Sequence, residues 1–221
     1  MSNPYEAACV DANLRPRKNI IEAYEEAASQ GVETGLELKC SGRTLAEGRM
    51  LDVDMKLLAE AMLKAHPFER LDLSFNELGG ESGGSLKRLL EGDTRLRSLD
   101  LTSNSLTPAP CKEIFKGLEK NSALRELRLS SNQLGDEAIV MLARVLPACG
   151  ALRMLWLSGN RIGDDGAGAL GEALPALGWM DRGSLLEELW LSANLIGDAG
   201  AAALADALKK QPALAVVNLV G

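Results

Sequence analysis

Aromatic side chains and histidine are scarce in this sequence. Of its 221 residues only 4% are aromatic, and His66 is the one histidine. Because 46% of the residues are still hydrophobic, we expect a core built from aliphatic side chains. A single histidine, with no C-x-x-C pair among the four cysteines, argues against a zinc site, and we expect no cofactor.

The cysteines also lack the paired spacing of a disulfide framework. Cys9, Cys40, Cys111 and Cys149 are far apart in the sequence. Isolated cysteines of this kind are typical of reduced, mostly buried thiols in a cytosolic protein.

The sequence also lacks an excess of positive charge and long apolar runs. The formal net charge is −7, which argues against a general nucleic-acid binder and against adhesion to an anionic membrane. No uncharged apolar run approaches the ~18 residues that a membrane span needs. The first residues show no basic segment followed by an apolar one, so we expect no secretory signal and a cytoplasmic location.

Catalytic constellations are not apparent either. No serine or cysteine has a base partner in the sequence frame. The glycine-rich stretch 79–84 lacks the Lys-Ser/Thr that completes a phosphate-binding loop. We therefore expect a protein that is not an enzyme.

What the sequence does contain is one phrase repeated five times. The frame L-x-x-L-x-L-x-x-N is clearest at 152–160 and recurs, with Phe68 in the first slot of one copy, at 68–76, 96–104, 124–132 and 186–194. Its asparagines stand at 76, 104, 132, 160 and 194, so the spacing is 28 residues three times and then 34. A fixed period of this size predicts a solenoid.

Each repeat changes its hydrophobic period from 2 to 3.6. Alternation in L-x-L predicts a short strand, and apolar residues four apart after the asparagine predict a helix. Three repeats place Gly-Asp before that helix, at 135–136, 163–164 and 197–198. We expect the glycine to turn the chain with a positive φ and the aspartate to cap the helix that it begins. The asparagine amides should satisfy buried backbone groups of the turn.

The two ends of the repeat array differ from its middle. Helices over 3–15 and 17–30 predict an N-terminal helical cap, residues 1–31, before a solenoid of about six repeats plus a terminal strand over 32–221. The first strand, 36–40, aligns by its leucines with 71–75. A last strand in 214–221 has no helix after it, which leaves the C-terminal edge of the solenoid uncapped.

The string N-x-I-G-D-x-G-A-x-A-L-x-x-A-L, at 160–174 and 194–208, resembles the ribonuclease-inhibitor-type leucine-rich repeat. The resemblance covers about residues 32–221. It implies an α/β fold: a curved, right-handed solenoid with a parallel sheet on its concave face and helices on its convex face. The same subclass includes ribonuclease inhibitor, the Ran GTPase-activating protein, tropomodulin, nucleotide-binding immune receptors and axonemal proteins.

Variable residues between the leucines should face the concave surface, because side chains alternate along a strand. The column between the two inner leucines of each phrase reads Glu37, Asp72, Asp100, Arg128, Trp156, Trp190 and Asn218. We therefore expect a surface that is acidic at its N-terminal end, basic in the middle and aromatic towards its C-terminal end.

Trp156 and Trp190 are the sharpest candidates for partner contact, since exposed neighbouring aromatics are typical of binding hot spots. The alternative is that they pack on each other and on Met154 to fill the concave floor. Arginines of the same surface could supply a charged rim or pair with nearby carboxylates. Trp179 lies in the six-residue insertion before the last full repeat. The candidate partner-binding residues are Trp156, Trp190, Met154, Arg128, Arg153, Glu188 and Trp179.

These features predict a non-catalytic scaffold or adaptor that binds a protein partner through its concave sheet. It could be a soluble regulator, or a subunit of a large cytoskeletal, axonemal or ciliary assembly joined through the uncapped edge. The alternative is a regulator of an enzyme such as a small GTPase, which would act through Arg128 or Arg153.

Overall fold

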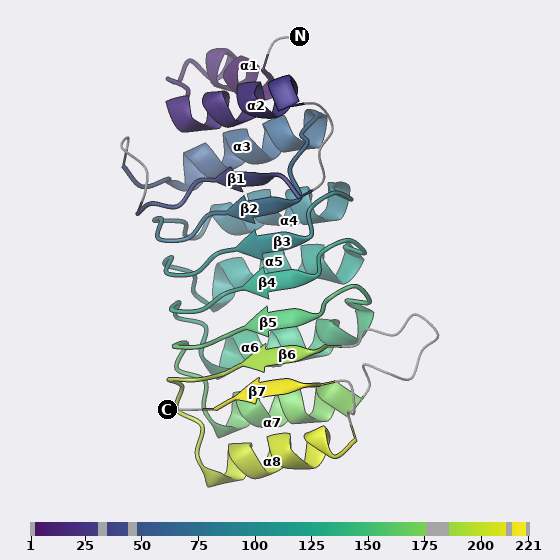
Figure 1. Ribbon diagram of the computed structural model, residues 1–221. Coiled ribbons are helices and arrows are strands. Elements are labelled where there is room, and N and C mark those ends of the chain that lie inside the picture. Colours follow the sequence, from purple (N-terminus) through teal and green to yellow (C-terminus); the bar gives the residue numbers. More distant parts are fainter. Residues whose placement is uncertain (1–2, 31–34, 44–47, 176–185, 211–213, 220–221) are drawn as a thin grey trace.

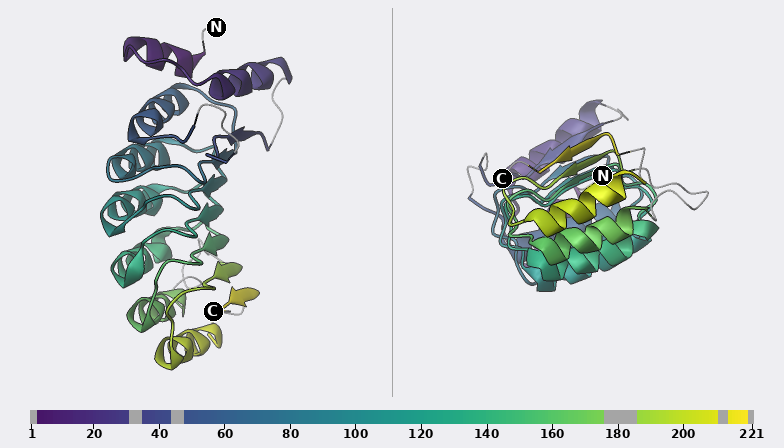
Figure 2. Two further views of the ribbon diagram at one scale, coloured as in Figure 1. Left: turned by 90° about the vertical axis from the view of Figure 1, so that its left-hand side faces the viewer. Right: turned by 90° about the horizontal axis from the view of Figure 1, so that it is seen from below.

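The computed structural model describes residues 3–30, 35–43, 48–175, 186–210 and 214–219. Strands and helices alternate along the chain and stack in sequence order (Figure 1). The strands form one parallel sheet of seven in the order β1 to β7, and the helices stand behind it on the convex side (Figure 2). The expected leucine-rich solenoid with a concave sheet is confirmed.

The strands are three residues long and pair in a constant register. They are β1 Glu37–Lys39, β2 Arg70–Asp72, β3 Ser98–Asp100, β4 Glu126–Arg128, β5 Met154–Trp156, β6 Glu188–Trp190 and β7 Val216–Asn218. Their central residues, from Leu71 to Leu189, are buried. Each central side chain points into the core, so the two flanking residues point to the concave side.

The predicted alignment of the first strand is wrong by two residues. Leu38, and not Leu36, pairs with Leu71, so Lys39 lies beside Asp72 and Glu37 beside Arg70. Leu38 is fully buried, whereas Leu36 is half-buried. Lys39 therefore heads the column in which we expected Glu37, and the N-terminal end of that column is less acidic than predicted.

One helix follows each of the first six strands, and two further helices precede the sheet. The helices are α1 Pro4–Asp11, α2 Lys18–Gln30, α3 Asp52–Lys64, α4 Ser82–Gly92, α5 Pro108–Lys120, α6 Gly135–Val145, α7 Asp164–Ala173 and α8 Asp198–Leu208, with a 3-10 turn, η1, at Leu146–Ala148. Pro108 stands in the first turn of α5, where its missing N–H is harmless.

The repeat asparagines form a ladder that joins neighbouring repeats. Asn132 donates from Nδ2 to the carbonyls of Leu101, in the preceding repeat, and Leu129, both at 3.0 Å. Its Oδ1 accepts the N–H groups of Asn104 (3.2 Å) and Leu106 (3.1 Å). The structural role predicted for these amides is confirmed, and it extends across the repeat boundary.

The aspartates after the Gly turn act across the same boundary. Asp136 accepts the N–H groups of Gly163 (2.7 Å) and Gly166 (3.0 Å), which begin the next helix, and Asp164 does the same for Gly197 and Gly200. The prediction that each aspartate caps its own helix is therefore wrong. A side chain at the start of one helix points to the neighbouring helix, which packs beside it in the stack.

Most positive φ angles occur four residues before the glycine positions at which we expected them. Gly135 has φ +59°, but Gly163 and Gly197 are extended. The left-handed residue is instead the one before the asparagine, as in Ser131 (φ 56°) and Ala193 (φ 55°). Gly163 is needed for space, because a Cβ there would stand 3.0 Å from an Asp136 carboxylate oxygen.

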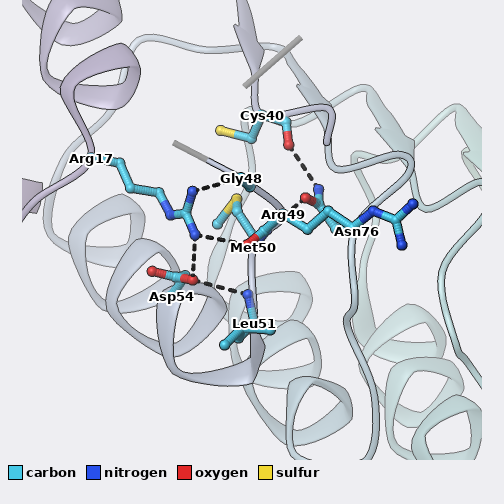
Figure 3. A network of polar contacts seen from close by, with 8 residues as sticks. All are labelled: Arg17, Cys40, Gly48, Arg49, Met50, Leu51, Asp54 and Asn76. Atoms are coloured by element: carbon cyan, nitrogen blue, oxygen red, sulfur yellow. Dashed lines mark hydrogen bonds and ion pairs between the residues drawn. The ribbon is translucent and has the colours of Figure 1, made fainter. Parts of the chain in front are cut away.

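The N-terminal helices are fastened to the first repeat by Arg17 (Figure 3). Its guanidinium donates to the carbonyls of Gly48 and Arg49 and to Asp54 Oδ2, each at 2.9 Å. Asp54 also accepts the N–H of Leu51, ahead of α3. Helices α1 and α2 thus cover the N-terminal edge of the sheet and of α3, as a cap should.

The core is aliphatic and encloses all four thiols. The cysteines are free and buried, as predicted. Burial raises the pKa of the Cys111 and Cys149 thiols to about 12, so both stay protonated near neutral pH. None of the described helices combines the length and apolar character that crossing a bilayer requires.

Candidate protein-interaction surface

The concave face carries two columns of side chains, one on each side of the buried central residues. The first column is Lys39, Asp72, Asp100, Arg128, Trp156, Trp190 and Asn218, and the second is Glu37, Arg70, Ser98, Glu126, Met154, Glu188 and Val216. From β3 to β6 both columns are half-buried. These side chains pack against one another on the concave side of the sheet, and their outer parts remain accessible to a partner.

Trp156 and Trp190 lie side by side on β5 and β6. Their ring centroids are 5.1 Å apart and their planes are inclined by 32°. The Arg128 guanidinium carbon stands 4.3 Å from the centroid of the Trp156 ring, on the neighbouring strand β4. Three consecutive strands therefore present one continuous stack, Arg128–Trp156–Trp190, which we call the aromatic stack. Cation–π contact of this kind stabilises the arginine in place.

The two indole N–H groups differ in their partners. Trp190 Nε1 donates to Glu188 Oε2 at 3.0 Å. Trp156 Nε1 is buried and has no acceptor among the described residues. A buried donor without an acceptor costs on the order of 1–3 kcal/mol. The indole that lacks an acceptor is thus the central member of the aromatic stack.

Carboxylates hold the arginine end of the stack. Arg128 donates from Nε to Glu126 Oε1 at 2.6 Å and lies 3.7 Å from Asp100 Oδ2. Its side chain is still 36% exposed. The ion pairs that we considered for Arg128 are present, and they fix its guanidinium over the Trp156 ring.

The remaining candidate residues have different surroundings. Arg153 donates to the carbonyls of Gly150 and Leu152 and lies 3.7 Å from Glu187, so it pairs with Glu187 and not with Glu188. Met154 is half-buried beside the aromatic stack, in register with Glu126 and Glu188. Trp179 lies outside the described residues.

A hollow adjoins the arginine end of the stack. It has a volume of about 340 Å³ and lies over β1 to β4, between Glu37 and Arg128. Its polar walls are Glu37, Arg70, Asp72, Ser98, Asp100, Glu126 and Arg128. The charged columns could be predicted from the sequence, but neither this hollow nor the buried indole N–H could be inferred from it. Among the described residues, no group of three or more His, Cys, Asp or Glu side chains could hold a metal ion.

Comparison with known proteins agrees with this architecture. The family model described as "Leucine Rich repeat" matches residues 64–87, 120–143, 152–171 and 184–205. The chain is a leucine-rich repeat protein. Each match contains one strand of the sheet and at least the beginning of the helix that follows it, so the family is recognised from the same repeated unit that builds the concave face. A search of curated proteins finds no match.

Two solved structures of leucine-rich type show how far this likeness extends. The tropomodulin C-terminal domain of Caenorhabditis elegans is 15% identical, with a TM-score of 0.53, and the similarity covers 71% of this chain and 92% of that one. An internalin (inlF) from Listeria monocytogenes is 19% identical, with a TM-score of 0.37, covering 79% and 53% of the two chains. At 15% identity the first comparison shows the fold alone.

Proposed function

We propose that this leucine-rich repeat protein is a non-catalytic scaffold that binds a protein partner through its concave sheet, with the aromatic stack at the centre of contact. The observation that carries the proposal is the stack itself. Two half-buried tryptophans lie in contact on an open face, with an arginine fixed over one of them. Tryptophan and arginine are the residues most enriched at the energetic centres of protein interfaces.

The partner should present an apolar group flanked by a hydrogen-bond acceptor. The apolar group would cover the exposed parts of the indole rings. The acceptor, a backbone carbonyl or carboxylate, would satisfy the N–H of Trp156, which has no partner among the described residues. Arg128 separates the rings from the charged hollow. A partner that spans both would bury polar groups against Asp72 and Asp100, at the rim of the contact.

The setting of this partner belongs to the same proposal. The resemblance to axonemal and other cytoplasmic repeat proteins suggests a cytoplasmic partner within a cytoskeletal or ciliary assembly. The alternative, regulation of an enzyme such as a small GTPase, needs an arginine that can reach the enzyme's nucleotide. Arg128 and Arg153 are both engaged with groups of this chain, so we favour the scaffold.

Site-specific cross-linking tests the location of the contact before the partner is known. A photoreactive amino acid replaces Met154 on the concave face, and in a second protein it replaces Arg88, which is exposed on α4. We expect a discrete cross-linked protein from position 154 and not from position 88. The same product from both positions, or from position 88 alone, would contradict the proposal.

Substitution of the central indole then tests its role in that contact. Trp156→Phe keeps an aromatic ring in the stack and removes the N–H, whereas Trp156→Ala removes both. We expect Trp156→Phe to weaken binding of the cross-linked protein by about tenfold, and Trp156→Ala by more. Equal affinities for the phenylalanine variant and the unaltered protein would show that the partner leaves the N–H unpaired.

A further inference from the structure

The hollow over β1 to β4 carries an excess of negative charge. Four carboxylates and two guanidinium groups form its charged walls, which leaves a net formal charge of −2. One of the two cations, Arg70, is exposed. The other, Arg128, is already bound to Glu126 and lies against the Trp156 ring. The hollow, with a volume of about 340 Å³, therefore suits a further positive charge.

Asp72 is the carboxylate of this hollow that has no cation beside it among the described residues. The other three each pair with a cation of this chain: Asp100 and Glu126 with Arg128, and Glu37 with Lys39. Asp72 Oδ1 accepts the N–H of Ser74 at 2.9 Å, which holds the carboxylate in place at the end of β2. Its second oxygen is thus oriented before any partner arrives.

The hollow and the aromatic stack lie in line across the sheet. Asp72 and Asp100 are neighbours in register on β2 and β3. Trp156 and Trp190 are neighbours in register on β5 and β6. The centres of the two pairs are three strands apart, which is about 14 Å at the usual strand spacing.

An extended segment matches this separation, and a helix does not. An extended chain rises about 3.3 Å per residue and returns a side chain to the same face at every second residue. Residues i and i+4 therefore lie about 13 Å apart on one face. In a helix the same distance takes about nine residues, and side chains nine residues apart point to opposite sides.

We propose that the concave face binds an extended segment of the partner in which a basic and an apolar residue are four positions apart. The basic side chain enters the hollow beside Asp72, and the apolar side chain covers the aromatic stack. This inference rests on the proposed function, because the stack is its second anchor.

The charges of the floor narrow the choice of residues further. A guanidinium group suits the hollow best, since its planar fork can donate to Asp72 and Asp100 together. The residue midway between the two anchors lies over β4, where Arg128 disfavours a second basic side chain. The net charge of −7 of the whole chain attracts such a basic segment.

Synthetic peptides test this spacing without the natural partner. The probes are Arg-Gly-Ser-Gly-Phe and its reverse, with blocked ends and a fluorescent label, and their affinities are measured by anisotropy. We expect the tighter probe to bind about fivefold more strongly than its analogue with citrulline, which has the shape of arginine without the charge. It should also bind more strongly than an isomer whose two anchors are two positions apart. Added salt should reduce the preference for arginine.

Asp72→Asn tests whether the basic side chain enters the hollow. The asparagine oxygen can still accept the Ser74 N–H, so we expect the fold to persist and the arginine peptide to bind no better than the citrulline peptide. Asp165→Asn, at an exposed aspartate of α7, is the matched control and should keep the full preference for arginine.

The outcomes separate this inference from the proposed function. Equal affinities of the arginine and citrulline peptides, with both lost in Trp156→Ala, would overturn the inference and leave the aromatic stack as the contact. A preference for arginine that survives in Asp72→Asn, or tighter binding of the isomer with the shorter spacing, would also overturn it. So would binding by none of the peptides, and the proposed function would then be judged by the cross-linking at position 154 alone.

Discussion

The carboxylate of Asp136 accepts the backbone N–H of Gly166 at 3.0 Å, from one repeat to the next. The same oxygen accepts Gly163 N–H at 2.7 Å. These bonds fix the start of α7 to the start of α6. In a solenoid, where each repeat contacts only its neighbours, such boundary contacts determine how far the repeats unfold together.

Removing this carboxylate should loosen one boundary. Asp136→Ala leaves two N–H groups without their acceptor, so we expect a loss of about 1–3 kcal/mol in the free energy of unfolding. Urea denaturation followed by circular dichroism measures it. Asp165→Ala is the matched control, and it should stay within about 0.5 kcal/mol of the unaltered protein. Equal effects of the two substitutions would show that the two hydrogen bonds of Asp136 contribute nothing to the free energy of unfolding.

Two glycines of α7 should respond in opposite directions to alanine. At Gly166 an added Cβ would stand 2.6 Å from Asp136 Oδ1, whereas at Gly168 it meets nothing within 4 Å. Gly168→Ala should therefore stabilise the protein by roughly 0.5–1 kcal/mol through helix propensity. Gly166→Ala should destabilise it despite the same gain in propensity. Thermal unfolding of the two variants measures both effects. Stabilisation by both substitutions would contradict the close approach of a Cβ at Gly166 to Asp136.

The asparagine ladder should be the most sensitive polar element of the fold. Asn132 is buried, donates to two leucine carbonyls and accepts two N–H groups. Asn132→Ala leaves the two N–H groups without an acceptor, while the two carbonyls keep their bonds from Asn104 and Asn160. We expect a loss of about 3–5 kcal/mol. Gln133, which is exposed directly after Asn132, serves as the control through Gln133→Ala. A loss below about 1 kcal/mol for Asn132→Ala would show that water replaces the amide.

Acid should weaken the N-terminal half of the solenoid through Asp93. Burial raises the pKa of this carboxyl, but its pairing with His66 and the N–H groups of Leu96 and Arg95 outweigh burial and hold the pKa below its usual value. A carboxyl with a depressed folded-state pKa stabilises the protein above the unfolded pKa, near 4. That stabilisation is lost as the pH falls through the folded pKa.

The urea midpoint should therefore fall between pH 5 and pH 2.5, and it should fall less steeply in Asp93→Asn. The asparagine keeps an oxygen for the two N–H groups and cannot ionise. Asp198→Asn is the control, because Asp198 is exposed and unpaired in the described chain, and its profile should follow that of the unaltered protein. Parallel profiles for all three proteins would show that Asp93 does not contribute to the loss of stability in acid.

Much of this fold follows from local pattern. The asparagine spacing predicts the repeated strand, turn and helix, and the buried role of the asparagine amides in the turn. The first strand was placed wrongly because Leu36 and Leu38 alternate equally well, and only pairing with Leu71 decides between them. The hydrogen bonds from Asp136 and Asp164 to the next helix could not be predicted. The sequence shows which residues begin a helix, but not that the aspartate of one helix lies within hydrogen-bonding distance of the start of the next.

The candidate surface was predictable in part for the same reason. Equivalent positions of consecutive repeats must be neighbours in a parallel sheet, so the contact between Trp156 and Trp190 follows from the period. The orientation of Arg128 over Trp156 depends on its pairing with Glu126 and Asp100, on two strands. The buried Trp156 N–H depends on ring orientation. Neither is encoded in spacing alone.

The most direct test of the account is the affinity of the protein that cross-links at position 154, measured by calorimetry against Trp156→Ala combined with Trp190→Ala. Leu195→Ala is the matched control, since this exposed apolar side chain lies outside the concave face. We predict at least a hundredfold loss of affinity for the tryptophan variant, about 1.4 kcal/mol at each position, with an unchanged circular dichroism spectrum and full affinity for the control. Undiminished binding by the folded tryptophan variant would contradict the central role of the aromatic stack.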